Sequence, residues 1–234
     1  MVLLLLILVP VAFAFYVGFR PAKESKNIAL IGSLACLALA SWSCYDFDWG
    51  RLSGTYQFNL DFLQTVKDAA NPAREVSEDR PLALIPAMGI DLRLGVDSVA
   101  MLLIALTALL GPICVLASFT AITERTKTYY AWLLVLQGAM TGVFAVRDLA
   151  LFYVCFEFTL IPMWILIHLY GSTNRAKAAP KFFLYTFTGS LIALAGLVYV
   201  VWFNAFAKPG HAGVWTFDMQ QLQNAAQLMS AKEQ

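Results

Sequence analysis

A series of long apolar runs constrains this chain more than any other feature. Each run has few or no charged side chains and reaches the roughly 20 mostly apolar residues that a transmembrane helix needs. Only 13% of all residues are charged, against roughly a quarter in soluble proteins. The sequence therefore predicts an all-α integral membrane protein of about six transmembrane helices, over residues 1–19, 27–45, 99–121, 129–146, 149–170 and 180–204.

Charged residues between the runs predict the orientation. The first, third and fifth loops contain Arg20, Lys23, Lys26, Arg125, Lys127, Arg175, Lys177 and Lys181. Because short basic loops stay in the cytoplasm, we expect the N-terminus to lie outside. Basic residues follow the first run and do not precede it, which favours a retained helix over a signal peptide. The net charge of +1 argues against a nucleic-acid partner.

We predict that the chain consists of four segments. Residues 1–45 form two helices, 46–98 an extracytoplasmic loop, 99–204 a four-helix unit and 205–234 an extracytoplasmic tail. Within the loop, TYQFNLDF and GIDLRLGVD alternate apolar and polar residues, which predicts short strands and a small β-hairpin. The polar, proline-containing stretch between them, residues 67–81, is interpreted as a flexible insert.

Glu157 stands near the middle of the fifth run. A carboxylate at the centre of a bilayer costs about 2.5–3.5 kcal/mol, so it is expected to face the bundle interior or a hydrated cavity. Desolvation favours its neutral form, and a nearby cation favours its charged form. A carboxyl balanced between the two can serve a proton relay. The alternative is a permanently protonated carboxyl that hydrogen-bonds a neighbouring helix.

Two further residues of this run bear on that choice. Pro162 cannot donate to the carbonyl of Phe158, and the freed carbonyl could hold ordered water or simply mark a packing kink. His168 lies eleven residues after Glu157, on nearly the same face and about 16 Å further along the axis. It could extend a polar path to the cytoplasm, or reach the lipid headgroups as an interfacial histidine.

Two charged residues flank these runs. Asp148 precedes the fifth run and is expected to pair with Arg147 in the turn or to cap the helix that starts at Leu149. Lys181 opens the sixth run at its cytoplasmic end. Snorkelling explains it, and a role in tuning protons at the inner mouth is the alternative.

The stretches GVFAVRDLALFYVCFEFTLIPMWILI and KFFLYTFTGSLIALAGLVYVVW resemble the antiporter-like membrane subunit M (chain 4) of proton-pumping NADH:quinone oxidoreductase, respiratory complex I. IPAMGIDLRLGVDSVAMLLIALTALLGPICVLAS resembles the segment of that family where a short hairpin leads into the third helix. The resemblance covers most of residues 83–204, and the FYVxxExxLIPM form and KFFLYT point to subunit M.

The resemblance implies roles for several residues. Glu157 matches the family's proton-translocating glutamate, Asp148 the acidic residue that starts that helix, and Asp97 a structural aspartate. It implies no cofactor in this chain, because NADH, flavin, iron–sulfur clusters and quinone belong to the rest of the complex. The partners implied are the other membrane subunits and the lipid bilayer, with the chain in a bacterial inner membrane. The chain shows no clustered cysteines and no nucleotide-binding glycine motif, and we expect no metal site.

Three functions remain open from the sequence. The chain could be the N-terminal half of a proton-pumping subunit, completed by a seventh helix with the lysine that partners Glu157. It could instead be a non-catalytic membrane scaffold or assembly protein derived from that subunit. A third alternative is part of a multisubunit cation/proton antiporter, although that function needs access from both sides of the membrane.

Overall fold

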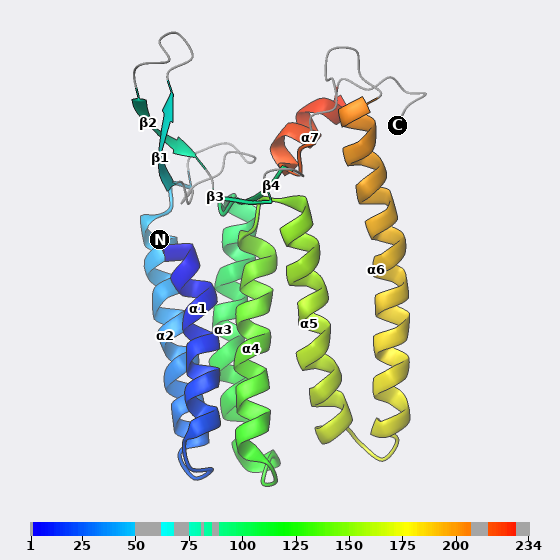
Figure 1. Cartoon of the computed structure of the whole chain (residues 1–234). Helices are drawn as coiled ribbons and strands as arrows, with labels where there is room; N and C mark the ends of the chain where they lie inside the picture. Colours follow the sequence, from blue (N-terminus) through cyan, green and yellow to red (C-terminus); the bar gives the residue numbers. More distant parts are fainter. Residues whose placement is uncertain are drawn as a thin grey trace.

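The computed structural model describes residues 2–49, 62–67, 75–80, 82–85, 89–206 and 215–227. Within these ranges, six long helices run side by side and a short helix lies beyond one end of the bundle (Figure 1). The helices are α1 (Val2–Phe19), α2 (Ser25–Asp46), α3 (Ser98–Ala121), α4 (Thr126–Ala145), α5 (Leu149–Tyr170), α6 (Arg175–Phe206) and α7 (Met219–Gln227). The strands are β1 (Phe62–Lys67), β2 (Glu75–Arg80), β3 (Leu82–Ile85) and β4 (Ile90–Leu92).

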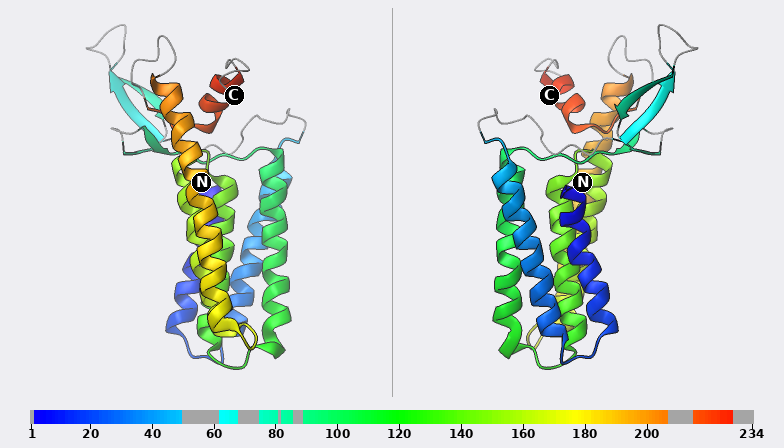
Figure 2. Two further views of the ribbon diagram at one scale, coloured as in Figure 1. Left: turned by 90° about the vertical axis from the view of Figure 1, so that its right-hand side faces the viewer. Right: turned by 90° about the vertical axis from the view of Figure 1, so that its left-hand side faces the viewer.

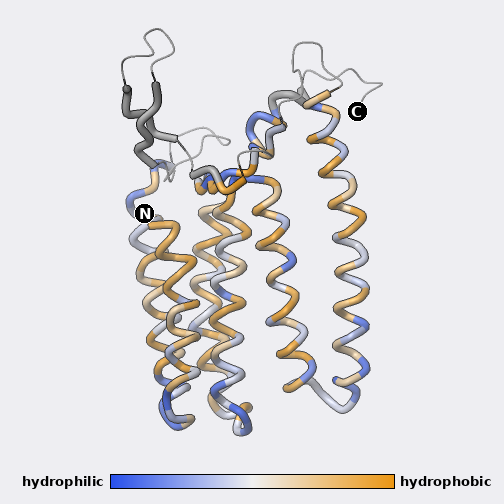
Figure 3. Tube along the Cα trace, in the orientation of Figure 1, coloured by the Kyte–Doolittle hydropathy of each residue, from blue (hydrophilic) through white to orange (hydrophobic). Residues whose placement is uncertain are grey.

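The two ends of the bundle differ in character. One end, here called the strand end, carries the four strands, the start of α1 and α7 (Figures 1 and 2). The other, here called the loop end, carries the short connections 20–24, 122–125 and 171–174. Hydrophilic residues gather at the loop end, whereas the helices between the ends are predominantly hydrophobic (Figure 3). The eight basic residues predicted to face the cytoplasm lie in or beside these short connections.

The predicted membrane helices are all present. Five of the described helices are long and apolar enough to cross a membrane, and α4 is the less apolar exception. α4 is also the central helix, in contact with α1, α2, α3 and α5. Its polar residues Gln137 and Thr141 are buried against neighbouring helices. The composition of α4 therefore follows from its neighbours, because other helices cover much of its surface.

Two apolar clusters hold α1 to α4 together. The cluster at the strand end joins α1, α2 and α3 to the segment before α3, through Leu6, Val96 and Ile104 among others. The cluster at the loop end centres on Tyr130 and Leu134 of α4, whose side chains have no exposed surface. α5 contacts α4 and α6, and the main contacts of α6 among the described elements are with α5 and α7. α6 therefore stands at the edge of the bundle.

Some predicted boundaries are wrong. α6 begins at Arg175, not at residue 180, because the polar stretch before Pro180 is rich in alanine and continues the helix. β2 lies inside the stretch interpreted as a flexible insert and pairs antiparallel with β1. A ladder of backbone hydrogen bonds does not require apolar side chains, so polarity alone could not exclude a strand.

The other predicted strands are only partly covered. β4 lies in GIDLRLGVD as expected, and β3 pairs with it in a short antiparallel hairpin. The stretch TYQFNLDF lies outside the described residues except for Phe62. The tail contains α7, a short helix that the sequence did not predict.

Candidate functional site

Glu157 lies inside α5, roughly 12 Å from the start of the helix at Leu149 and roughly 20 Å from its end at Tyr170, at 1.5 Å per residue. Its Oε1 atom is buried and has no hydrogen-bond partner among the described residues. A buried carboxyl oxygen without a donor is costly. This atom therefore needs a partner, such as water, a proton or a cation.

The environment of Glu157 is the interface between α5 and α6. Tyr153, one turn earlier on the same face, is close enough to interact with both Glu157 and Ser190 of α6. Tyr153 and Ser190 line a cleft of about 360 Å³ between the two helices, together with Phe152, Phe156, Thr186, Gly189, Ala193 and Leu197. Apart from the Thr186 hydroxyl, the rest of this lining is apolar, and Tyr153 carries the hydroxyl in it that interacts with Glu157.

α5 stays helical past Pro162, which is buried. One and a half turns later, His168 stacks on Trp164, with ring centroids 5.3 Å apart. The Nδ1 atom of His168 is buried without a hydrogen-bond partner. His168 also lines a polar cleft of about 450 Å³ at the loop end, beside Glu124, Arg125 and Arg175 among other residues. His168 therefore belongs to a polar site at the loop end and makes no contact with Glu157.

Lys181 does not join the site. It is exposed in the second turn of α6, and in the described part of the chain it forms no ion pair with Glu157. Within the described residues, Lys181 and Glu157 thus lie on neighbouring helices without an ion pair, and a role of Lys181 in tuning protons at the inner mouth stays a prediction.

Asp148 has a structural position at the strand end. It is fully buried, and its Oδ1 accepts hydrogen bonds from the backbone N–H groups of Ala150 at 3.0 Å and Leu151 at 3.1 Å. Its Oδ2 accepts from the N–H of Asp91 at 3.2 Å. Asp148 therefore caps α5, as one of the two predicted alternatives held. Burial raises the pKa of Asp148, and these three backbone hydrogen bonds oppose the rise.

Three segments distant in sequence meet around this cap. Arg147 N donates to Arg93 O at 2.9 Å, and Leu149 N donates to Phe217 O at 2.8 Å. The Arg93 guanidinium forms ion pairs with Asp91, at 2.7 Å, and with Asp218. The turn between α4 and α5 is thus held between residues 91–93 on one side and 217–219 on the other. We call this arrangement the strand-end clamp.

Asp97 is the N-cap of α3, where its Oδ1 accepts from Ala100 N at 2.7 Å. This is a purely local contact. It agrees with the structural role that the resemblance implies.

Sequence reasoning missed several of these residues. Tyr153 could have been found, because a hydroxyl four residues before a buried carboxyl shares its helix face. Ser190, Arg93 and Asp218 could not, because only tertiary packing brings them to Glu157 and Asp148.

The comparisons with known proteins agree with this geometry. Residues 146–232 match the family model described as NADH:quinone oxidoreductase/Mrp antiporter, TM. The F(420)H(2) dehydrogenase subunit M of Methanosarcina mazei is 32% identical over 219 residues, which cover 93% of this chain and 39% of that protein. The NADH-quinone oxidoreductase subunit M of Rhodobacter capsulatus is 44% identical over 131 residues, which cover 56% of this chain and 25% of that protein.

Solved structures share the fold. A chain of respiratory complex I from Thermus thermophilus superposes with a TM-score of 0.69 at 23% identity, over 96% of this chain and 39% of that chain. A chain of the archaeal membrane-bound sulfane sulfur reductase gives a TM-score of 0.68 at 21% identity, over 96% of this chain and 40% of that chain. The chain spans about two-fifths, 39%, of the first relative's length. Over this part of their length, the chain is similar to antiporter-like membrane subunits such as subunit M of NADH-quinone oxidoreductase.

Proposed function

We propose that this chain is part of a proton-translocating, non-redox membrane subunit of an NADH:quinone oxidoreductase, in which Glu157 takes up and releases the transported proton. The observation that carries the proposal is the buried, unpartnered Oε1 of Glu157 halfway along a membrane helix. A carboxyl placed there for structure alone would be expected to have its oxygens satisfied. A carboxyl that takes up and releases a proton instead needs space for a hydrogen-bond partner that changes with its protonation state.

Tyr153 and Ser190 support this role. Their hydroxyls reach from Glu157 to the cleft between α5 and α6, and hydroxyls can both donate and accept. The polar cleft at His168 supplies a second group of polar residues about 16 Å away, by the helix rise from Glu157 to His168. We infer that protons enter from the loop end. The basic residues there support our proposal that this end faces the cytoplasm of a bacterial cell.

Further protein is proposed to cover α5 and α6. Both helices present large apolar side chains outward, including Val154 at 59% exposure and Ile192 at 72%. Because the matched relatives are much longer than this chain, we infer that a further segment of the same subunit, or a separately encoded chain, packs on this face. It would supply the cation that partners Glu157. Reading the coding sequence beyond Gln234 for further spans with an intramembrane lysine tests this inference.

We propose that the electron donor binds to other subunits and not to this chain. Relatives are named for NADH and for F(420)H(2). We propose that any flavin, iron–sulfur cluster or quinone site belongs to other subunits.

Glu157→Gln in the assembled complex tests the proposal. The amide matches the carboxyl in shape but does not exchange a proton at physiological pH, so proton pumping into inverted vesicles should fall at least tenfold while the complex remains assembled. Glu24→Gln at the loop end is the matched control, because Glu24 is exposed and lines none of the described clefts, and it should pump normally. If Glu157→Gln pumps as well as the unmodified complex, the scaffold alternative replaces the pump.

A further inference from the structure

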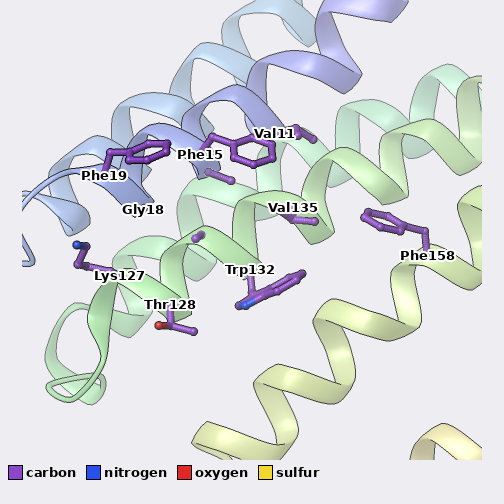
Figure 4. A pocket seen from close by; sticks show the side chains of 11 residues that line it. Val11, Phe15, Gly18, Phe19, Lys127, Thr128, Trp132, Val135 and Phe158 are labelled. Atoms are coloured by element: carbon purple, nitrogen blue, oxygen red, sulfur yellow. The ribbon is translucent and has the colours of Figure 1, made fainter.

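A second cleft, unconnected with Glu157, opens between α1 and α4. Its volume is about 700 Å³, and its wall includes Phe15 and Phe19 of α1 and Trp132 and Val135 of α4 (Figure 4). Phe158 of α5 lies at the end opposite Lys127 (Figure 4). Most of the lining is apolar, and α1 and α5, which contribute to it, are long and apolar enough to cross a membrane.

The length of the cleft suits one leaflet of a bilayer. From Lys127 to Val135 the helix rises roughly 12 Å, and half of a bilayer's hydrocarbon core is about 15 Å. Lys127 lies in the first turn of α4 at the loop end. The cleft therefore starts near the headgroup layer and reaches towards the middle of the membrane.

Charge distinguishes this cleft from an ordinary lipid-facing groove. Lys127 is its only charged residue among the described residues that line it, Thr128 and the indole of Trp132 add polar atoms, and none of these residues is a carboxylate. In the described part of the chain Lys127 forms no ion pair. The neighbouring Glu124 lines the other polar cleft instead. An ammonium group at the polar end of an apolar cleft complements a ligand with one anionic head and one long apolar tail.

We propose that this cleft is a binding site for an anionic phospholipid of the leaflet at the loop end. One acyl chain lies along Phe15, Trp132 and Val135 as far as Phe158. The phosphodiester group is held by the ammonium of Lys127. An apolar protein helix in the same place would cover Lys127 without supplying an anion, and burial of an unpaired cation is costly.

Two substitutions test the proposal on the chain purified with whatever subunits accompany it. Lys127→Gln removes the charge and should lower the preference for dioleoylphosphatidylglycerol over dioleoylphosphatidylcholine about fivefold, the factor for about 1 kcal/mol per basic residue at an anionic surface. Gly18→Leu fills the cleft, because Gly18 lines it and a Cβ there meets nothing within 4 Å. Gly18→Leu should remove one retained lipid, whether phosphatidylglycerol or phosphatidylcholine. Native mass spectrometry counts the retained lipids of each kind.

Matched controls come from α6. Lys177→Gln removes an exposed basic residue near the loop end, and Gly196→Leu adds a side chain where a Cβ also meets nothing within 4 Å. Both should bind lipid as the unmodified chain does. Brominated phosphatidylglycerol should also quench the fluorescence of Trp132, and Gly18→Leu should abolish that part of the quenching. A wild-type chain without preference for the anionic lipid, or a Trp132 that brominated lipid does not quench, overturns the proposal.

Discussion

Replacing Asp148 tests how the strand-end clamp stabilises the fold. Its two carboxylate oxygens have separate tasks, since Oδ1 caps α5 and Oδ2 accepts from Asp91. Losing an N-cap costs about 1 kcal/mol, and leaving a partly buried N–H without an acceptor costs about 1–2 kcal/mol more. Asp148→Ala should therefore lower the free energy of unfolding by about 2–3 kcal/mol. Asp148→Asn keeps the capping oxygen and should cost about 1 kcal/mol.

The pKa of Asp148 adds a pH dependence with a defined sign. Burial raises the pKa of this carboxyl above its ordinary value of 3.8, so the folded chain binds the proton more tightly than the unfolded chain. The free energy of unfolding then falls as pH rises from about 3.8 to the raised value, and is level above it. Asparagine does not titrate there, so the penalty for Asp148→Asn should be largest at acid pH and should shrink towards neutral pH.

Unfolding by sodium dodecyl sulfate in mixed micelles, followed by far-UV circular dichroism, measures these differences. Asp46→Ala is the control, because Asp46 is an exposed acidic residue at the same end of the bundle. Equal costs for Asp148→Ala and Asp148→Asn, or a loss below about 0.5 kcal/mol for Asp148→Ala, would refute the reasoning from the cap.

Three other substitutions have defined outcomes. Asp218→Asn weakens the ion pair with Arg93, and should raise hydrogen exchange of residues 215–227, which include α7, while α1 to α6 stay protected. Gly138→Leu places a Cβ 2.9 Å from the carbonyl oxygen of α1 residue Ile7, and should cost about 1–3 kcal/mol of unfolding free energy through overpacking. Tyr130→Phe removes the hydroxyl that accepts a hydrogen bond from Ser118 at 3.2 Å, and should cost about 1 kcal/mol. Unchanged stability of the Tyr130→Phe chain would show that Ser118 is satisfied by Val115 alone.

The helices were predictable because the length and apolarity of each run are enough to predict a transmembrane helix. Even α4 was found, although it is the least apolar of the six, since its polar residues are interspersed with leucine, valine and alanine. Helix ends were less certain. The run before Pro180 lacks hydrophobicity, and only the observed backbone shows that the helix extends through it.

The candidate site was predictable where the signal is local. A carboxylate in the middle of a span and an aspartate before a helix stand out in the sequence. In the structure, Glu157 has a buried oxygen without a partner among the described residues, and Asp148 caps α5. The partners of Glu157 and Asp148 were not predictable, because Ser190, Arg93 and Asp218 are brought near by tertiary contacts. The pairing of β1 with β2 was likewise hidden, since a polar strand has no apolar period to reveal it.

The strand-end clamp has a consequence for the direction in which Glu157 points. The backbone bonds of Arg147 and Leu149 to residues 93 and 217 fix the residue at which α5 begins. Each residue added or removed at that turn would rotate α5 by about 100°. Such a shift would carry Glu157 away from Ser190 of α6 and towards lipid or α4. The azimuth of a carboxyl in the middle of the membrane is thus set by hydrogen bonds at its surface, roughly 12 Å away.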